Sequence, residues 1–438
     1  MNPIIYLPAR WLAAVMTVLL SVTALPARAA IDGIAGPVFN LTAGADRIST
    51  ADGDSIYAWG YAHDPDGSGP LTGTMQYPGP TLIVNQGDTI TINLSNTLPV
   101  PVSIIFPGQQ GVTSSGGAAG LLTQEAAAMS GGTPGTVSYT FTATHAGTYH
   151  YHSGTQPALQ VEMGLMGALI VRPSAVADPL HQAYSHPDTA FAREHLFVLT
   201  EIDPLIHQQV EFQVINGQAV NVDTSAYHPV LWFINGRNAP DTMLDANVPW
   251  LPTQPYNSLP RAHPGEKLLM RVIGGGRDLH PFHTHGNNFW VIARDGRVLE
   301  SAPGAGPDLA FSDFTLRTVP GETYDAIFEW TGKGLGWDVY GHAAGDPLQP
   351  NEYAPDHGKA IPVVLPNLQD LTVGPQYSGS PYLGRLGTLP PGQVQLDQNA
   401  GYYHMWHSHN EREIVNNDIF PGGMMTMLII EPANVPIP

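Results

Sequence analysis

The sequence predicts an all-β protein built from two β-sandwich domains. Three observations lead to this prediction: short runs of β-branched and aromatic residues between turns, the lack of a convincing long amphipathic helix, and a unit that occurs twice. The 438 residues include 47 glycines and 41 prolines, which favours many turns between short strands. Hydrophobic residues make up 43% of the chain, which is ample for buried cores.

The predicted strands are short and are bounded by glycine, proline and asparagine. Clear examples are residues 81–84, 89–94, 137–142 and 289–293, where β-branched and aromatic side chains are concentrated. Such side chains fit a pleated, half-buried surface. These segments therefore predict the strands of the sandwiches.

A turn followed by a strand begins at Gly87 and again at Gly265, and each half closes on a similar apolar strand, at 164–173 and at 423–432. Matches in the same order indicate a duplicated unit. We expect a first domain at 31–175 and a second at 190–438. Residues 176–189 form the predicted linker, and 343–390 are predicted to be long loops of the second domain because they are rich in proline and glycine.

Within this alignment, Ile105-Phe106-Pro107 stands opposite His283-Thr284-His285, and His152 stands opposite His407. The second half therefore has histidines where the first half has apolar residues.

Residues 1–29 are predicted to be a secretory signal peptide. Arg10 precedes an apolar run at 11–25, and the small residues Ala27 and Ala29 flank a cleavage site. No later segment is apolar enough to cross a bilayer. We expect a protein of the periplasm or the extracellular space, with no membrane contact after the signal is removed.

The formal net charge is −20, and there is no cysteine. So acidic a chain repels nucleic acid and anionic lipid, which makes them improbable partners. Exported proteins often contain disulfides. This chain cannot form one, so its stability must come from packing and from bound metal.

Three short windows, at 150–152, 280–286 and 404–409, hold eight of the 18 histidines. Residues i and i+2 of a strand point to one face, so each His-x-His pair can present two imidazoles to one metal. Imidazole suits copper, zinc and iron. The three pairs predict His150, His152, His283, His285, His407 and His409 as metal ligands, and His280 and His404 are further candidate ligands in the same windows.

Other residues are open to two interpretations. His263, His342 and His357 are either second-layer partners of a metal or unrelated to it. Met424, Met425 and Met427 fit a soft cuprous-ion site, but ordinary strand positions in a core explain them better.

The windows resemble the copper motifs of the multicopper oxidases. Residues 280–286 resemble the third motif, 147–153 the second, and 407–409 with 423–425 the fourth. The resemblance implies cupredoxin-like Greek-key sandwiches and copper as the cofactor. The two-domain layout is similar to two-domain laccases and copper nitrite reductases, which implies a homotrimer with copper between subunits.

The resemblance also implies individual roles. In the family pattern, type 1 copper collects electrons and passes them to a cluster that reduces dioxygen. His280 matches a type 1 ligand, and Met424 or Met425 matches the axial methionine. The ligands of the oxygen-reducing cluster are matched by His152, His283, His285, His407 and His409.

The chain departs from that pattern at several positions. Ser408 replaces the type 1 cysteine, and Glu413 stands at or near the next type 1 histidine. A blue-copper centre needs the thiolate. Residues 105–107 lack the first His-x-His, and Gly154 replaces a histidine of the second motif. These losses favour a site of one or two coppers over a three-copper cluster.

The first functional hypothesis is a copper-dependent oxidoreductase that oxidises a small substrate or a metal ion by direct contact, with dioxygen as the expected oxidant. Its predicted catalytic residues are Glu411, Glu413 and Asp418, which would hold a substrate cation, accept a proton or orient the ligands. A salt-bridged loop around Arg412 explains these acids equally well. The alternatives are a non-catalytic copper-binding or delivery protein and a site similar to that of nitrite reductases.

Overall fold

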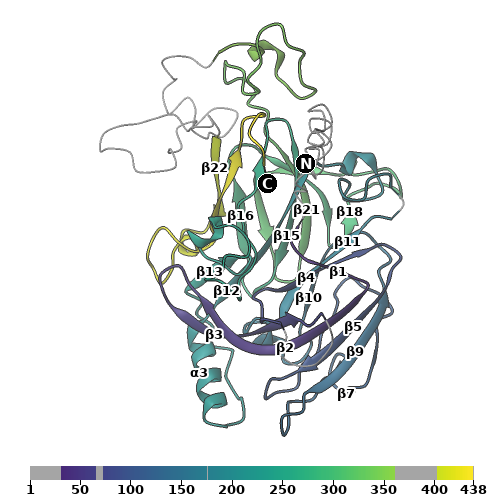
Figure 1. Cartoon of the computed structure of the whole chain (residues 1–438), viewed down its shortest axis with the longest axis vertical. Helices are drawn as coiled ribbons and strands as arrows, with labels where there is room; N and C mark the ends of the chain where they lie inside the picture. The colour runs from purple at the N-terminus through teal and green to yellow at the C-terminus, as the bar shows by residue number, and fades with distance from the viewer. Residues whose placement is uncertain (1–30, 66–72, 175, 361–401, 438) are drawn as a thin grey trace, which may run out of the picture.

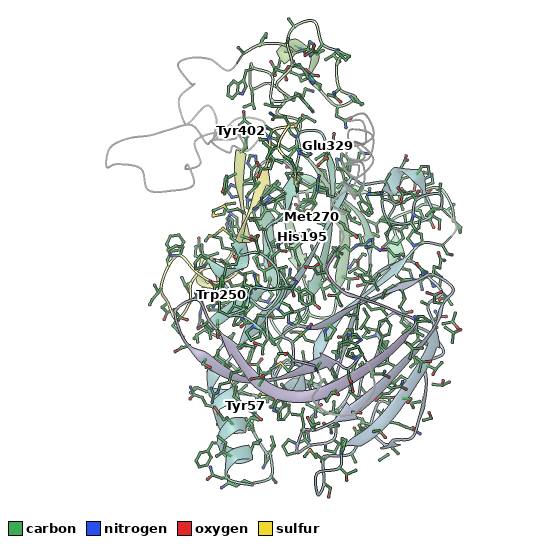
Figure 2. All side chains as sticks on the ribbon, in the orientation of Figure 1. Tyr57, His195, Trp250, Met270, Glu329 and Tyr402 are labelled. Atoms are coloured by element: carbon green, nitrogen blue, oxygen red, sulfur yellow. The ribbon has the colours of Figure 1, made fainter. Side chains whose placement is uncertain are left out.

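A computed structural model describes residues 31–65, 73–174, 176–360 and 402–437. The predicted signal peptide lies outside the described residues, as does most of the predicted loop region 343–390. The described chain is dominated by strands, as predicted (Figure 1). No helix among the described residues is long and apolar enough to cross a membrane.

The first half of the chain forms two sheets around one core, which contains Trp59, Tyr139 and Tyr151. Sheet 1 has the order β3 (Ser55–His63), β2 (Val38–Ser49), β5 (Thr89–Asn96), β9 (Gly135–Thr142) and β6 (Thr113–Ser115). Sheet 2 has the order β1 (Ile34–Ala35), β4 (Gly79–Asn85), β11 (Met166–Arg172) and β10 (Gly147–His152). A small hairpin pairs β7 (Ala118–Ala119) with β8 (Gln124–Glu125).

The second half also forms two sheets, around a core that contains Phe282, Phe328 and Trp406. Sheet 3 has the order β13 (Leu231–Ile234), β12 (Arg193–Ile202), β15 (Lys267–Gly274), β21 (Thr323–Glu329), β17 (Phe289–Arg294) and β18 (Arg297–Val298), and β19 (Phe311–Asp313) pairs with β17. Sheet 4 has the order β14 (Arg261–Ala262), β23 (Met425–Ile430), β22 (Tyr402–Ser408), β16 (His280–Thr284) and β20 (Thr315–Thr318).

The two halves repeat the same strand pairing. β2 runs parallel to β5 as β12 does to β15, and β4 runs parallel to β11 as β14 does to β23. At the ends of these sheets, Ile105 pairs with His152 as His283 pairs with His407. The repeat in the sequence therefore corresponds to the same arrangement of paired strands in each half. The bounds of two domains remain a prediction.

Helical structure is confined to short segments outside the sheets. The described helices are α2 (Pro157–Gln160) and α3 (Pro204–Ile215), with 3-10 turns η1 (Pro187–Thr189), η2 (Asp241–Met243), η3 (Ala354–Asp356) and η4 (Glu411–Ile414). The Asp203 side chain caps α3 by accepting a hydrogen bond from the amide of Leu205 at 3.0 Å.

The outer face of sheet 2 packs on the outer face of sheet 3, so that β10 and β11 lie beside β12, β15 and β21 (Figure 1). Apolar contacts between the two faces join Ala168 and Ile170 to Val198 and Ile273. A buried polar network crosses the same boundary, and its members are Arg172, Glu194, Arg271, Asp325 and Thr148. Sheet 4 lies on the other side of the second core, away from this boundary.

Candidate metal centre

Three of the predicted ligands converge on the outer face of sheet 4. β16 and β22 are antiparallel neighbours, and His283 stands opposite His407. Phe282 and Trp406 point into the core, so side-chain alternation turns His283 and His407 outward. The ligand nitrogens of His283, His285 and His407 all lie within 4.8 Å of one another. We call these three residues the outer cluster.

His409 borders the outer cluster. Its ring centroid lies 4.8 Å from that of His283 and 5.7 Å from that of His407, and the residue is exposed. His409 thus borders the outer cluster but is not one of the three residues whose ligand nitrogens lie within 4.8 Å of one another.

Hydrogen bonds orient the ring nitrogens of the outer cluster. The Nδ1 of His407 donates to the carbonyl oxygen of Ser408 at 2.6 Å, which leaves its Nε2 facing the Nε2 of His285 at 3.2 Å. The Nδ1 of His283 lies 2.8 Å from the hydroxyl oxygen of Thr315 on β20. Partners of this kind fix the tautomer of a metal-binding histidine.

The imidazoles of the outer cluster are neutral near pH 7. Burial and then the neighbouring imidazoles lower the pKa of His283 and of His285 to about 4. Burial also lowers the pKa of His407. Because a metal binds the deprotonated ring, such a group is ready to bind a cation without first losing protons.

The inner face of the same strands carries a different arrangement, centred on His280. Its Nε2 donates to Glu201 at 2.8 Å and its Nδ1 donates to Glu413 at 2.9 Å, and all three residues are buried. Burial by itself lowers the pKa of His280, but the two carboxylates outweigh it and raise this pKa to about 9. His280 is therefore a protonated cation between two acids, which we call the inner triad.

The two carboxylates of the inner triad accept further hydrogen bonds. Ser408 donates its hydroxyl to Glu413 at 2.6 Å, and Asn410 donates to the same carboxylate at 2.9 Å. Glu201 accepts from the hydroxyl of Tyr227 and from the backbone amide of Asp278, each at 2.9 Å. Buried charges persist when their hydrogen bonds are satisfied in this way.

The inner triad corrects the expectation for His280. A metal ligand needs a free nitrogen lone pair, but both ring nitrogens of His280 are bonded to carboxylates. Glu413, predicted to be catalytic, is 3% exposed and serves this ion network instead. Ser408 and Glu413 thus fill the positions that the family pattern assigns to type 1 copper donors.

His404 also lies on the inner face of sheet 4 and not in the outer cluster. It is buried, its ring lies 5.6 Å from that of Trp330, and a side chain at Gly286 would come within 2.8 Å of it. Its spacing of three residues from His407 places it on the opposite face of β22.

His150 and His152 lie on β10, away from the outer cluster. Their rings are 5.0 Å apart, and His150 stands opposite Ala168 in the boundary between the two halves. His150 is buried, and neither of its ring nitrogens has a hydrogen-bond partner. The Nδ1 of His152 donates to the carbonyl of Ser153 at 3.0 Å. The expected convergence of imidazoles from both halves is therefore not present within one chain.

The other predicted residues have simpler surroundings. Glu411 and Asp418 are exposed. Within the described parts of the chain Arg412 forms no ion pair, and it lies over the ring of Trp232 at 5.8 Å. Met424 and Met425 are both buried; Met425 begins β23, and Met424 directly precedes that strand and packs in the second core.

Glu201 is the residue that sequence reasoning missed. It lies at the end of β12, far from every histidine window, and no local pattern marks it. The sequence carries one indirect sign of this residue, which is a glycine where a larger residue would clash. A Cβ atom at Gly276 would lie 1.8 Å from the Glu201 carboxylate. The glycine run at 274–276 is thus a sign of a crowded site.

The fold and the site together define a class: a protein of two cupredoxin-like sandwiches with a histidine cluster on one sheet face. Residues 70–176 match the family model for multicopper oxidase. The resemblance to the multicopper oxidase family is confirmed, and the chain has no cysteine for a type 1 site. Copper, predicted from the motifs, agrees with this family.

Individual relatives are distant or partial. The chain is 41% identical to multicopper oxidase MCE of Talaromyces pinophilus over 101 residues, 22% of this chain and 15% of that protein. It is 26% identical to copper resistance protein A of Escherichia coli over 281 residues, 58% of this chain and 42% of that protein. The chain thus spans less than half the length of these curated relatives.

Solved structures of low identity support the fold. Multicopper oxidase mgLAC has a TM-score of 0.56 at 18% identity, with 92% of this chain and 87% of that chain covered. The blue copper oxidase of Nitrosomonas europaea has a TM-score of 0.53 at 19% identity, with 89% and 85% covered.

Proposed function

We propose that the outer cluster binds copper and that the protein is a copper-dependent oxidoreductase acting on a small substrate or a metal ion, with dioxygen as the oxidant. The observation that carries the proposal is the convergence of three neutral imidazoles, from His283, His285 and His407, on one point. Copper bound there supplies a redox centre and a Lewis acid.

The residues around the cluster support direct contact with a substrate. His283 and His285 are partly exposed, and Phe314, 45% exposed, packs its ring 5.5 Å from that of His283. An apolar ring beside the ligands offers a surface for an aromatic reductant. In the family pattern, electrons enter through type 1 copper. The inner triad leaves no donor set for that copper, so a substrate would have to reduce the outer cluster's copper directly.

We also propose that a neighbouring chain completes the centre. In one chain the outer cluster takes its three histidines from the second half alone, and the exposed side chains of Phe311 on β19 and of Phe314, between β19 and β20, suit an interface. A homotrimer, in which His152 of the first half meets the outer cluster of a neighbour, is the arrangement suggested by resemblance. Sedimentation of the copper-loaded protein tests it, and a monomer contradicts it. The predicted signal peptide supports a location in the periplasm or outside the cell.

Copper stoichiometry is the direct test. We expect His283→Ala and His407→Ala to lose bound copper, measured by elemental analysis and by electron spin resonance, while His181→Ala, at an exposed histidine paired with Asp178, retains it. Unchanged copper in both cluster variants contradicts the assignment.

Oxygen uptake with a panel of reductants then tests the oxidase activity. Residues 105–107 lack the histidines of the first motif, which favours the alternative of a copper-binding or delivery protein. Full copper binding without oxygen uptake, with copper passed to a chelator, would identify that alternative.

A further inference from the structure

A second group of metal-ligand side chains lies in the segment between β21 and β22. It consists of Asp338, His342, Glu352 and His357, whose ligand atoms all lie within 4.8 Å of one another. In Figure 1 this segment is the green loop beyond the upper ends of the strands. We call these residues the loop group. None of them belongs to the histidine windows or to the outer cluster.

The two carboxylates of the loop group are buried and held in place. The side chains of Asp338 and Glu352 are 2% and 3% exposed. Asp338 accepts backbone amides from Tyr340 at 2.8 Å, His342 at 3.2 Å and Gly358 at 3.0 Å. Backbone from both ends of the segment thus fixes this carboxylate, as surrounding hydrogen bonds do for metal ligands.

The two imidazoles point at these carboxylates through Nδ1. The Nδ1 of His357 lies 2.6 Å from Glu352, and the ring also hydrogen-bonds the backbone of Asp346. The Nδ1 of His342 lies 3.3 Å from Glu352 and 3.7 Å from Asp338. It is buried and has no hydrogen-bond partner.

An internal ion pair explains only half of the loop group. The Nδ1 of His357 satisfies one oxygen of Glu352, whereas the Nδ1 of His342 makes no hydrogen bond and has only the longer ion-pair contact with Glu352 at 3.3 Å. Buried polar atoms without a partner are uncommon and costly. A cation among the four side chains would satisfy all of them at once.

We propose that the loop group binds one divalent first-row transition metal ion, of which zinc is the probe. Two imidazoles and two carboxylates are an accepted donor set for zinc, whereas calcium and magnesium take oxygen ligands. Tetrahedral bonds of about 2.0–2.2 Å place neighbouring donors about 3.3–3.6 Å apart. The separations of 2.6, 3.3, 3.7 and 4.0 Å in the loop group bracket that spacing.

The ion would have a structural role. It would join Asp338 to His357 and so close the segment in which the backbone amide of Asp338 bonds the carbonyl of Lys359 at 2.8 Å. With four protein donors the site has no open position for a substrate, which is the arrangement of structural zinc sites. It does not depend on the copper proposed for the outer cluster.

Zinc binding to chelator-treated protein tests the proposal. We expect His342→Gln/His357→Gln to bind one zinc per chain fewer than the wild type after gel filtration. The matched control, His181→Gln/His186→Gln, changes two histidines that pair with Asp178 and Asp188 outside the loop group and should bind zinc as the wild type does. Equal zinc in all three proteins overturns the proposal.

The same comparison in a His283→Ala background separates this site from the outer cluster. The difference of one zinc should persist there, even if the outer cluster binds no copper. Zinc should also raise the melting temperature of His283→Ala, but not that of the His283→Ala variant that carries His342→Gln and His357→Gln as well.

Should the loop variant fail to fold, X-ray absorption at the zinc edge of His283→Ala decides the question. Two nitrogen and two oxygen donors are expected, and a shell with no imidazole overturns the proposal.

Discussion

β16 and β22 carry histidines on both of their faces, and the two faces differ in chemistry. On the outer face, His283 and His407 are neutral, and their ligand nitrogens lie within 4.8 Å of each other and of a ligand nitrogen of His285. On the inner face, His280 is a cation held between Glu201 and Glu413. The comparison shows that two flanking carboxylates hold His280 as a cation, whereas the outer-cluster histidines lack such partners and stay neutral.

The largest expected effect is on stability, and it separates the two faces. His280→Ala leaves Glu201 and Glu413 buried without their cation, which typically costs about 3–5 kcal/mol of unfolding free energy. His283→Ala removes a partly exposed ring with one hydroxyl contact and should cost about 1 kcal/mol. Urea unfolding of both metal-free variants measures the difference. Similar costs for the two variants would refute the inner triad.

The pH dependence of stability sharpens the same contrast. The pKa of His280 is about 9 in the folded protein, whereas the ordinary value of 6.5 applies in the unfolded chain. Its stabilising contribution is therefore complete below pH 6.5 and is lost as the pH rises through 9. The difference corresponds to about 3 kcal/mol. Urea midpoints of the metal-free protein from pH 6 to pH 9.5 should fall, and His280→Gln should flatten this dependence. A wild-type profile that does not fall above pH 6.5 contradicts a protonated His280.

A spectroscopic test asks whether the inner triad has replaced a type 1 copper site. Ser408→Cys alone should give no intense blue absorption with copper, because Glu413 still holds the Nδ1 of His280. Ser408→Cys/Glu413→His frees that nitrogen and supplies a thiolate with two imidazoles, the donor set of blue-copper centres. Glu201 would remain on Nε2 as an orienting partner. The blue band should therefore appear only in the double variant, and its appearance in Ser408→Cys alone contradicts the role given to Glu413.

Much of the fold and part of the site followed from sequence. Strand signals and the repeat predicted the all-β architecture, and His-x-His alternation placed His283 with His285 on one face. The same alternation also contained a signal that His280 and His404 are different. Each lies three residues from an outer-cluster histidine in its strand, and odd spacing means the opposite face.

The inner triad could not be predicted in full, because its partners meet only through tertiary structure. Glu201 is the second-last residue of β12, and His280 begins β16 in the opposite sheet of the second half. No local pattern records that contact. The loop group presents the same difficulty, since Asp338 and Glu352 are ordinary acids in an irregular segment until the chain folds back on itself.

The smallest expected effect concerns Met424, which directly precedes β23 and lies beside the inner triad. This methionine matches the family's axial type 1 ligand, but it is fully buried in the second core. Exchange of methionine for leucine keeps the volume and usually costs less than about 1.5 kcal/mol. Met424→Leu should therefore change the urea midpoint slightly and leave copper binding and spin-resonance parameters unaltered. A shift in those parameters would show that copper reaches the inner face, and the division between the two faces would then be wrong.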